Sequence, residues 1–257
     1  MKILTSVVLL AIPLLAFGQG ATGQQTSDQQ TSNEEQVRRV IAYTDAYRKH
    51  LPSLECDETM LSERVKNGKV KREVKIKATL RELRDEKEPG GFRDEYTFNS
   101  IDGKKAKPDF DTGTLPYFVY KAFANGIGIG EGLLPACLSY RFATLDDGRT
   151  QQLNIDSKPN VRDPSCNKIP DDYHKMMLID TASGAVRRVE RRMSPEFADY
   201  NLEIPYIAID YAPQKLGEET FWLPTRFEAV DVHQQGGMIA AYSNCHRYTV
   251  VSKIVVP

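Results

Sequence analysis

The stretch VKREVKIKATLR, at residues 70–81, determines the fold class of this chain. Its even-numbered positions carry mainly apolar side chains and its odd-numbered positions mainly charged ones, which is the two-residue period of a β-strand. A strand with one apolar and one charged face belongs to an antiparallel sheet that meets water on one side. Asn67–Gly68 precedes it as a strong hairpin dipeptide, so a partner strand is expected over residues 54–65.

Further strand patterns follow along the chain, separated by short turns that contain Gly. We expect strands at residues 92–101, 136–145, 149–156, 173–180, 185–193, 202–211, 219–232 and 238–256. The turns between them are expected at 89–91, 102–103, 147–148, 183–184, 216–217 and 235–237. Such a meander indicates a single, strongly curved antiparallel sheet.

Two helices are expected to cover this sheet. Residues 34–51 place apolar side chains at helical spacing, and Pro52 ends the pattern. Residues 115–124 show a shorter pattern that Thr114 can cap and Asn125–Gly126 can end. The predicted fold class is therefore α+β, an open half-barrel covered by an N-terminal helix and a short mid-chain helix.

The N-terminus carries the pattern of an export signal. Residues 1–18 contain Lys2, an apolar run and small residues near the expected cleavage point, and the run is too short to span a bilayer. Residues 19–33, rich in Gln, Thr and Ser, are predicted to be a disordered polar leader, and residues 34–257 a single domain. We expect an exported protein, in the periplasm or outside the cell, that is not an integral membrane protein.

The composition excludes some partners. The 257 residues include 34 Lys and Arg against 35 Asp and Glu, with 40% hydrophobic residues. A net charge of −1 lacks the broad positive field that non-specific nucleic-acid binding uses, so no nucleic acid is expected.

Four cysteines stay in the mature chain, where an oxidising compartment favours disulfides. Four Cys allow three pairings, and the sequence does not decide among them. We favour Cys137 with Cys166, since a hairpin at residues 147–148 would return the chain towards Cys137, which leaves Cys56 with Cys245. A zinc site is disfavoured because no two Cys have the usual short spacing, and no metal is predicted.

The motifs that could carry chemistry are incomplete. Asp111–Thr112–Gly113 matches half of an aspartic protease site, but there is no second copy, so a turn and cap are expected there. The alternating glycines of residues 126–132 lack the dinucleotide-binding spacing. We predict no catalytic residues and no cofactor. A secreted hydrolase that uses Asp109, Asp111 or the group at residues 171–174 remains the least favoured alternative.

Two strands with apolar residues on both faces are more informative about function than these motifs. The strands at 202–211 and 219–232 are apolar on both faces and therefore need cover from helices or from a ligand. The residues predicted to line a pocket or the core are Phe118, Phe123, Tyr206, Ile207, Phe221, Trp222 and Phe227. Arg187 and Arg191 share a strand face and could meet an anionic headgroup inside, the alternative being a solvated face.

The order of these elements resembles the LolA-like superfamily of periplasmic proteins, which includes lipoprotein carriers and regulators of envelope stress. The stretch MMLIDTASGAVRRVE, at 176–190, is similar to the strand, Asp, turn-Gly, strand element of that family. IDYAPQKLGEETFWLPTRFE, at 209–228, fits the hairpin that usually follows. The chain looks closest to a poorly described secreted bacterial branch.

The resemblance implies a half-barrel whose concave apolar face receives acyl chains, and it implies no catalytic set. The predicted function is accordingly an envelope binding protein for a lipid or a lipidated partner. The alternative is a non-enzymatic interaction or regulatory module that binds an envelope protein and fills its interior with its own side chains.

Overall fold

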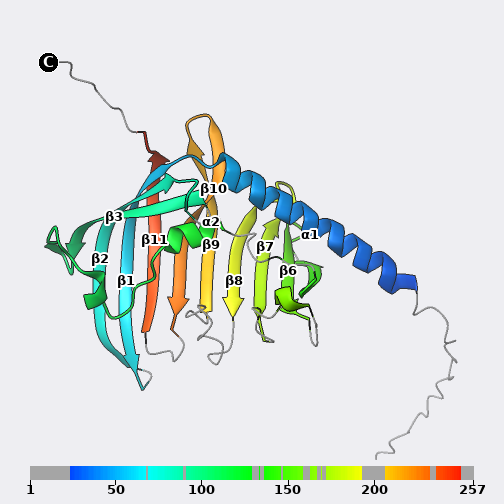
Figure 1. Cartoon of the computed structure of the whole chain (residues 1–257), viewed down its shortest axis with the longest axis horizontal. Coiled ribbons are helices and arrows are strands. Elements are labelled where there is room, and N and C mark those ends of the chain that lie inside the picture. Colours follow the sequence, from blue (N-terminus) through cyan, green and yellow to red (C-terminus); the bar gives the residue numbers. More distant parts are fainter. Residues whose placement is uncertain are drawn as a thin grey trace, which may run out of the picture.

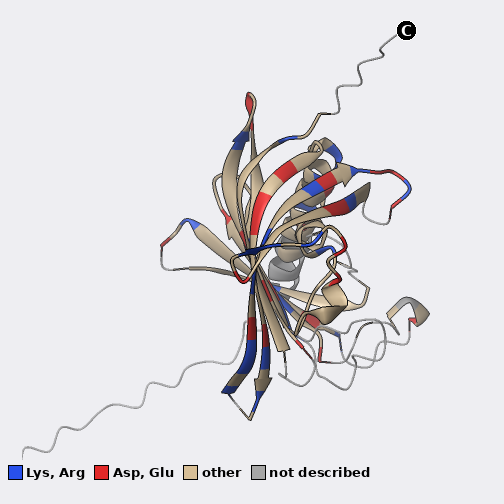
Figure 2. Ribbon diagram, turned by 90° about the vertical axis from the view of Figure 1, so that its left-hand side faces the viewer, with Lys and Arg blue, Asp and Glu red and all other residues tan. Residues whose placement is uncertain are grey.

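The computed structural model describes residues 24–67, 69–88, 91–128, 133, 136–145, 147–158, 163–166, 169, 172–192, 206–231 and 236–249. Within these residues the chain forms one eleven-stranded antiparallel sheet with two α-helices (Figure 1). The sheet ends at β4 on one side and β5 on the other, so it stays open. Seen from the side, its strands curve around the helices (Figure 2). The predicted curved α+β half-barrel is confirmed.

The strands follow the sequence patterns closely. They are β1 Leu54–Lys66, β2 Lys69–Arg84, β3 Phe92–Ile101, β4 Lys104–Lys105, β5 Leu138–Thr144, β6 Thr150–Ser157, β7 His174–Asp180, β8 Val186–Arg192, β9 Tyr206–Leu216, β10 Glu219–Val230 and β11 Gly236–Arg247. The two-residue β4 was not predicted. β11 ends at Arg247 and Tyr248–Thr249 leave the sheet, short of the predicted end at 256. Residues 193–205 and 250–257, and the predicted signal peptide at 1–18, lie outside the described residues.

The order of strands in the sheet is β4-β3-β2-β1-β11-β10-β9-β8-β7-β6-β5. The first strand of the chain thus pairs with the last, from Leu54↔Arg247 to Arg64↔Gly236. Because β4 and β5 are consecutive in the chain but lie at opposite edges, the connection between them must cross the sheet. Its described part holds a 3₁₀ turn at Thr112–Thr114 and α2 Ala122–Ile127, which contacts β3 and β10.

The mid-chain helix differs from the prediction of residues 115–124. The Tyr117 N–H donates to Ser62 Oγ at 2.9 Å, and the Ser62 hydroxyl donates to the Tyr117 carbonyl at 2.6 Å. These bonds to β1 occupy backbone groups that a helix would use internally. Pro116 also disfavours helical geometry at Leu115. The chain therefore turns helical only from Ala122, and Asp111 rather than Thr114 caps the preceding turn, by accepting from the Gly113 N–H at 2.8 Å.

The N-terminal helix α1 spans Gln24–His50 and crosses the inner face diagonally, with its first turns projecting past the β5 edge (Figure 1). Val37, Val40, Thr44 and Tyr47 form its buried stripe. The helix includes residues 24–33, which composition assigned to a disordered leader. A helix nucleated by the packed stripe extends at little cost through good helix formers such as Gln.

Two disulfides join parts of the sheet that are distant in sequence. Cys56 in β1 is bonded to Cys245 in β11, across 189 positions, and Cys137 is bonded to Cys166. These are the pairings that the sequence favoured. The first ties the two ends of the meander together at the pairing that unites the sheet.

Gly126 gives a direct test of the crossing connection. The hydroxyl of Tyr211 in β9 donates to its carbonyl at 2.7 Å, and a Cβ at this position would lie 2.7 Å from Cγ of the buried Pro224. Replacing Gly by Ala inside a helix with free space around it stabilises the helix by about 1 kcal/mol. Here we expect Gly126→Ala to lower the free energy of unfolding by about 1–3 kcal/mol, through overpacking, in urea titrations.

Asn125→Ala is the matched control, because Asn125 is exposed on the same helix. It should change the unfolding free energy by no more than about 0.5 kcal/mol. A Gly126→Ala variant as stable as the parent would contradict the close approach of α2 to β10.

Candidate functional site: a cavity beneath the N-terminal helix

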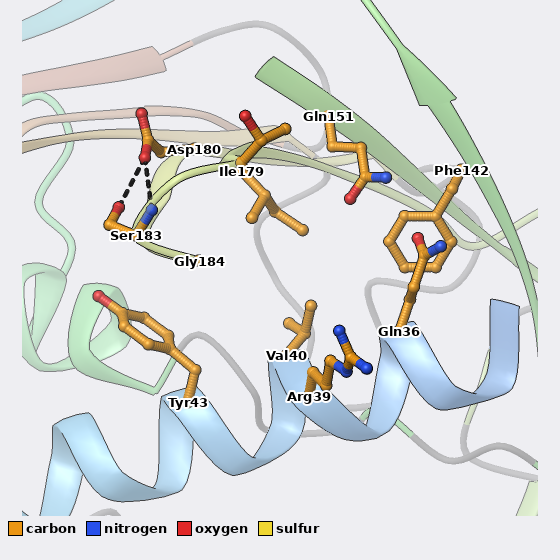
Figure 3. Close-up of a pocket in the computed structure, with 11 residues that line it drawn as sticks. Gln36, Arg39, Val40, Tyr43, Phe142, Gln151, Ile179, Asp180, Ser183 and Gly184 are labelled. Atoms are coloured by element: carbon orange, nitrogen blue, oxygen red, sulfur yellow. Dashed lines mark hydrogen bonds between the residues drawn. The ribbon is translucent and has the colours of Figure 1, made fainter. Parts of the chain in front are cut away.

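A cavity of about 440 Å³ lies between α1 and the end of the sheet formed by β5, β6 and β7 (Figure 3). It is partly open to solvent, and its size falls in the range of ligand pockets, roughly 300–1,000 Å³. The lining residues are Gln36, Arg39, Val40, Tyr43, Phe142, Gln151, Ile179, Asp180, Thr181, Ser183 and Gly184.

The walls combine apolar surface from both layers. Val40 and Tyr43 come from the buried side of α1, while Phe142 and Ile179 come from β5 and β7 (Figure 3). Burial raises the pKa of Tyr43 to about 12, so its ring meets the cavity with a neutral hydroxyl. Apolar walls of this kind favour the alkyl part of a ligand.

Polar groups surround these walls. Arg39 forms an exposed ion pair with Glu35 at 2.7 Å on the same helix. Asp180 Oδ1 accepts from both the hydroxyl and the backbone N–H of Ser183, each at 2.8 Å, and these bonds hold the pKa of Asp180 below its usual range (Figure 3). The cavity therefore carries a guanidinium and an ionised carboxylate beside its apolar walls.

The turn between β7 and β8 shapes one side of the cavity. The Gly184 N–H donates to the Asp180 carbonyl at 2.8 Å, and Gly184 has a φ of 70°, which favours glycine. The Thr181 N–H and hydroxyl both donate to the carbonyl of Arg149, at 2.9 and 3.0 Å. The Asp and turn-Gly that carried the family resemblance thus lie at the cavity, although the sequence did not assign them to it.

None of the residues predicted to line a pocket borders this cavity. Phe123, Ile207, Phe221 and Phe227 are buried in the core cluster. The half-buried members are Tyr206, Trp222 and Phe118, and Phe118 contacts the rings of Tyr96, Phe98 and Tyr120.

The two arginines of β8 lie in different surroundings. A register shift between Leu178 and Ile179 pairs these residues with Arg188 and Val186, and leaves Arg187 without a partner in the ladder. Arg187 is exposed, and its Nη1 donates to Thr150 Oγ1 at 3.2 Å. Arg191 is half-buried, and burial lowers its pKa while the nearby Tyr173 opposes that effect. The local bulge breaks the alternation that would have put both on one face.

The residues considered for hydrolysis are not assembled into a catalytic group among the described residues. Asp111 caps a turn, and Asp109 is exposed. His174 Nδ1 lies 2.7 Å from Asp156 Oδ1, and Arg141 bonds the other oxygen of Asp156 at 2.8 Å. Asp171 lies outside the described residues. Within those residues there is no group of three His, Cys, Asp or Glu side chains that could hold a metal.

A cluster of carboxyl groups inside the sheet escaped the sequence analysis. Glu58 lies opposite Tyr242 of β11, and Glu82 lies opposite Asp94 of β3. Glu58 and Glu82 are 1% and 0% exposed, on the inner face with the apolar residues. The signal was present, because both occupy positions where the alternation of β1 and β2 calls for an apolar residue.

The surroundings of these buried carboxyl groups favour their protonated, neutral form. Burial, helped by the nearby Asp94, raises the pKa of Glu58 to about 8, against a small opposing effect of the Tyr242 hydroxyl. Burial and the neighbouring carboxyl group of Asp94 raise the pKa of Glu82 as well. The Tyr96 hydroxyl donates to Asp94 at 3.1 Å. The positive charge of Lys121, on the crossing connection, opposes the rise in the pKa of Glu82 and of Asp94. Because Glu58 and Glu82 are shielded from solvent, we assign the cluster to the core and not to a cleft that binds substrate.

No family model matches the chain, and no curated protein matches its sequence. Several solved structures are similar at 10% identity. One is a domain assigned to outer membrane lipoprotein sorting from Vibrio parahaemolyticus, with a TM-score of 0.43 over 86% of this chain and 95% of that one. Another is a DUF1329 family protein from Desulfovibrio piger, with a TM-score of 0.39 over 86% and 95%. A third is a LolA superfamily protein from Nitrosomonas europaea, with a TM-score of 0.37 over 84% and 94%.

One of these structures carries the name of the superfamily that the sequence pattern resembles. With TM-scores below 0.5, they provide no argument about the ligand or the partners of this chain. The ligand is therefore inferred from the cavity and the residues around it.

The buried Glu58 predicts a pH dependence of stability. Its pKa rises from 4.5 to about 8 on folding, so the folded state keeps a proton that the unfolded chain releases above pH 4.5. The stability is therefore fully present below pH 4.5 and falls as pH rises towards 8, by about 1.4 kcal/mol per pH unit for this proton. Urea titrations across that range should show the loss.

Glu58→Gln should reduce the slope by about 1.4 kcal/mol per pH unit, because a neutral amide cannot ionise. Glu218→Gln, on an exposed turn residue, should keep the slope of the parent. Equal slopes for the parent and Glu58→Gln would show that Glu58 ionises freely in the folded protein.

Proposed function

We propose that this protein is an exported binding protein of the cell envelope that holds the acyl chain of a lipid or a lipidated partner in the cavity beneath α1. The observation that carries the proposal is the cavity itself, of about 440 Å³, with apolar walls and charged groups beside them. An amphiphile has the same two parts, an alkyl chain and a polar head. The cavity residues lie on α1, on strands of a well-packed sheet and on the hydrogen-bonded turn between β7 and β8, which favours a preformed site.

The attachment of α1 supports entry of a ligand from one side. Its C-terminal part is firmly held, because Tyr47 and the following Leu51 are buried and Arg84 Nη2 donates to the carbonyl of Arg48 at 3.0 Å. The middle of α1, from Gln36 to Tyr43, lies over the cavity, and nearer the N-terminus Asn33 reaches the carbonyl of Tyr140 at 3.5 Å. Small movements of the part of α1 that precedes Val37 would admit a chain while the buried stripe stays packed.

Two observations agree with export. The predicted signal peptide would send the chain to an oxidising compartment, and both disulfides suit that environment. Among the described residues no helix combines the length and the apolar character needed to cross a bilayer.

Native mass spectrometry of the protein purified from its export compartment tests the proposal. We expect an additional mass in the range of an acyl lipid that organic extraction removes. A bare polypeptide mass that stays unchanged after incubation with lipids would contradict the proposal and favour a protein-interaction module.

A substitution in the cavity makes the test specific. Gln36→Trp adds bulk from the cavity side of α1, and we expect it to weaken binding of a fluorescent fatty acid about tenfold, a loss of about 1.4 kcal/mol. Ala42→Trp adds the same side chain on the exposed side of α1 and should bind as the parent does. Equal affinities of the two variants would place the ligand elsewhere.

A further inference from the structure

The hairpin of β1 and β2 ends in a concentration of positive charge that the cavity does not explain. Between Arg64 and Lys77 the sequence has seven Lys and Arg but a single acidic residue, Glu73, in a chain whose net charge is −1. Figure 2 shows Lys and Arg positions, in blue, gathered along the lower end of the hairpin. We call the part with five cations, Arg64, Lys66, Lys69, Lys71 and Arg72, the basic tip; all five are exposed.

The basic tip extends beyond its neighbours in the sheet. The pairing of β1 with β11 ends at Arg64, and the pairing of β2 with β3 ends at Ile76. In Figure 1 the tip is the lowest part of the sheet, away from α1. Its two strands are therefore accessible on both faces and along the β2 edge.

Within the tip, like charges face each other. Arg64 lies directly opposite Arg72, and Lys66 lies directly opposite Lys69. Like charges at opposed cross-strand positions destabilise a sheet. Among the described residues, none of the five cations forms an ion pair, and Glu73 is engaged with Lys75 at 3.2 Å. A sequence that keeps such repulsion without internal compensation indicates a surface built for an external anion.

An exposed apolar residue lies among these charges. Val70 is 52% exposed, and it stands between Lys69 and Lys71. Apolar side chains flanked by cations suit the boundary between headgroups and acyl chains of a bilayer. We propose that the basic tip docks this protein on the surface of an anionic lipid bilayer, with its cations on the headgroups and Val70 at the acyl boundary.

The composition of the hairpin favours lipid over nucleic acid. Residues 61–79 contain no Phe, Tyr or Trp, so the tip has no ring on which an unpaired base could stack. Clusters of four to eight Lys and Arg near a membrane are typical of anionic lipid binding, and each cation contributes about a fivefold gain in affinity.

Co-sedimentation with vesicles tests the inference. We expect the full chain to bind vesicles of phosphatidylcholine mixed with phosphatidylglycerol, and not vesicles of phosphatidylcholine alone. Binding should fall as salt is added, because exposed charges are screened. The triple variant Lys66→Gln, Lys69→Gln, Lys71→Gln should bind about a hundredfold more weakly, and Val70→Ser should weaken binding without changing its salt dependence.

A matched control removes the same charge elsewhere. Arg38→Gln, Lys49→Gln, Lys215→Gln changes three exposed cations on α1 and β9 and should bind as the parent does. Thermal unfolding should show that both triple variants stay folded, since none of the six side chains is buried.

Three outcomes would overturn the inference: no binding to anionic vesicles, equal binding to both vesicle types, or an equal loss in the two triple variants. Binding of a single-stranded oligonucleotide in place of the vesicles would overturn it in favour of nucleic acid. The inference is independent of the proposed cargo, because Gln36→Trp leaves the tip intact and should bind vesicles normally even if it binds no fatty acid.

Discussion

The pairing of β1 with β11 is the constraint on which the rest of the structure depends. It joins the beginning of the described sheet to its end, and the disulfide between Cys56 and Cys245 fixes the two strands covalently. Without it, β1 to β4 and β5 to β11 would be two separate sheets. With it, β4 and β5 become the opposite edges of one sheet, and the chain between them has to cross its face.

That crossing divides the inner face into two parts with different contents. Over β1, β10 and β11 the crossing connection packs closely: Phe123 meets the ring of Tyr242, and Gly126 brings α2 against Pro224. The buried carboxyls belong to this filled part. Over β5, β6 and β7 the sheet is covered by α1, whose side chains leave the cavity unfilled.

The same sheet also separates two kinds of surface. The cavity combines apolar walls with a few charges, and it lies under a helix. The basic tip carries five exposed cations around Val70, and it lies where β1 and β2 extend beyond their neighbours in the sheet. A protein that takes up an acyl chain has to meet a membrane or a lipidated partner, so a cargo site and a docking site on different strands are compatible in one molecule.

The sequence by itself predicted most of the strands and turns, and it favoured the two disulfide pairings that form. Alternation at residues 70–81 and the turn at Gly184 depend on contacts between near neighbours, which a local pattern records. It could not determine the start of α2, because Ser62, distant in sequence, takes the backbone bonds of Tyr117. Nor could it find the cavity or the carboxyl cluster, since α1 meets β7, and Glu82 meets Asp94, only after folding. The alternation of side chains along a strand is a local property that the sequence records. Strand register and the path of the connection across the sheet depend on pairings between distant strands, so only the tertiary structure decided them.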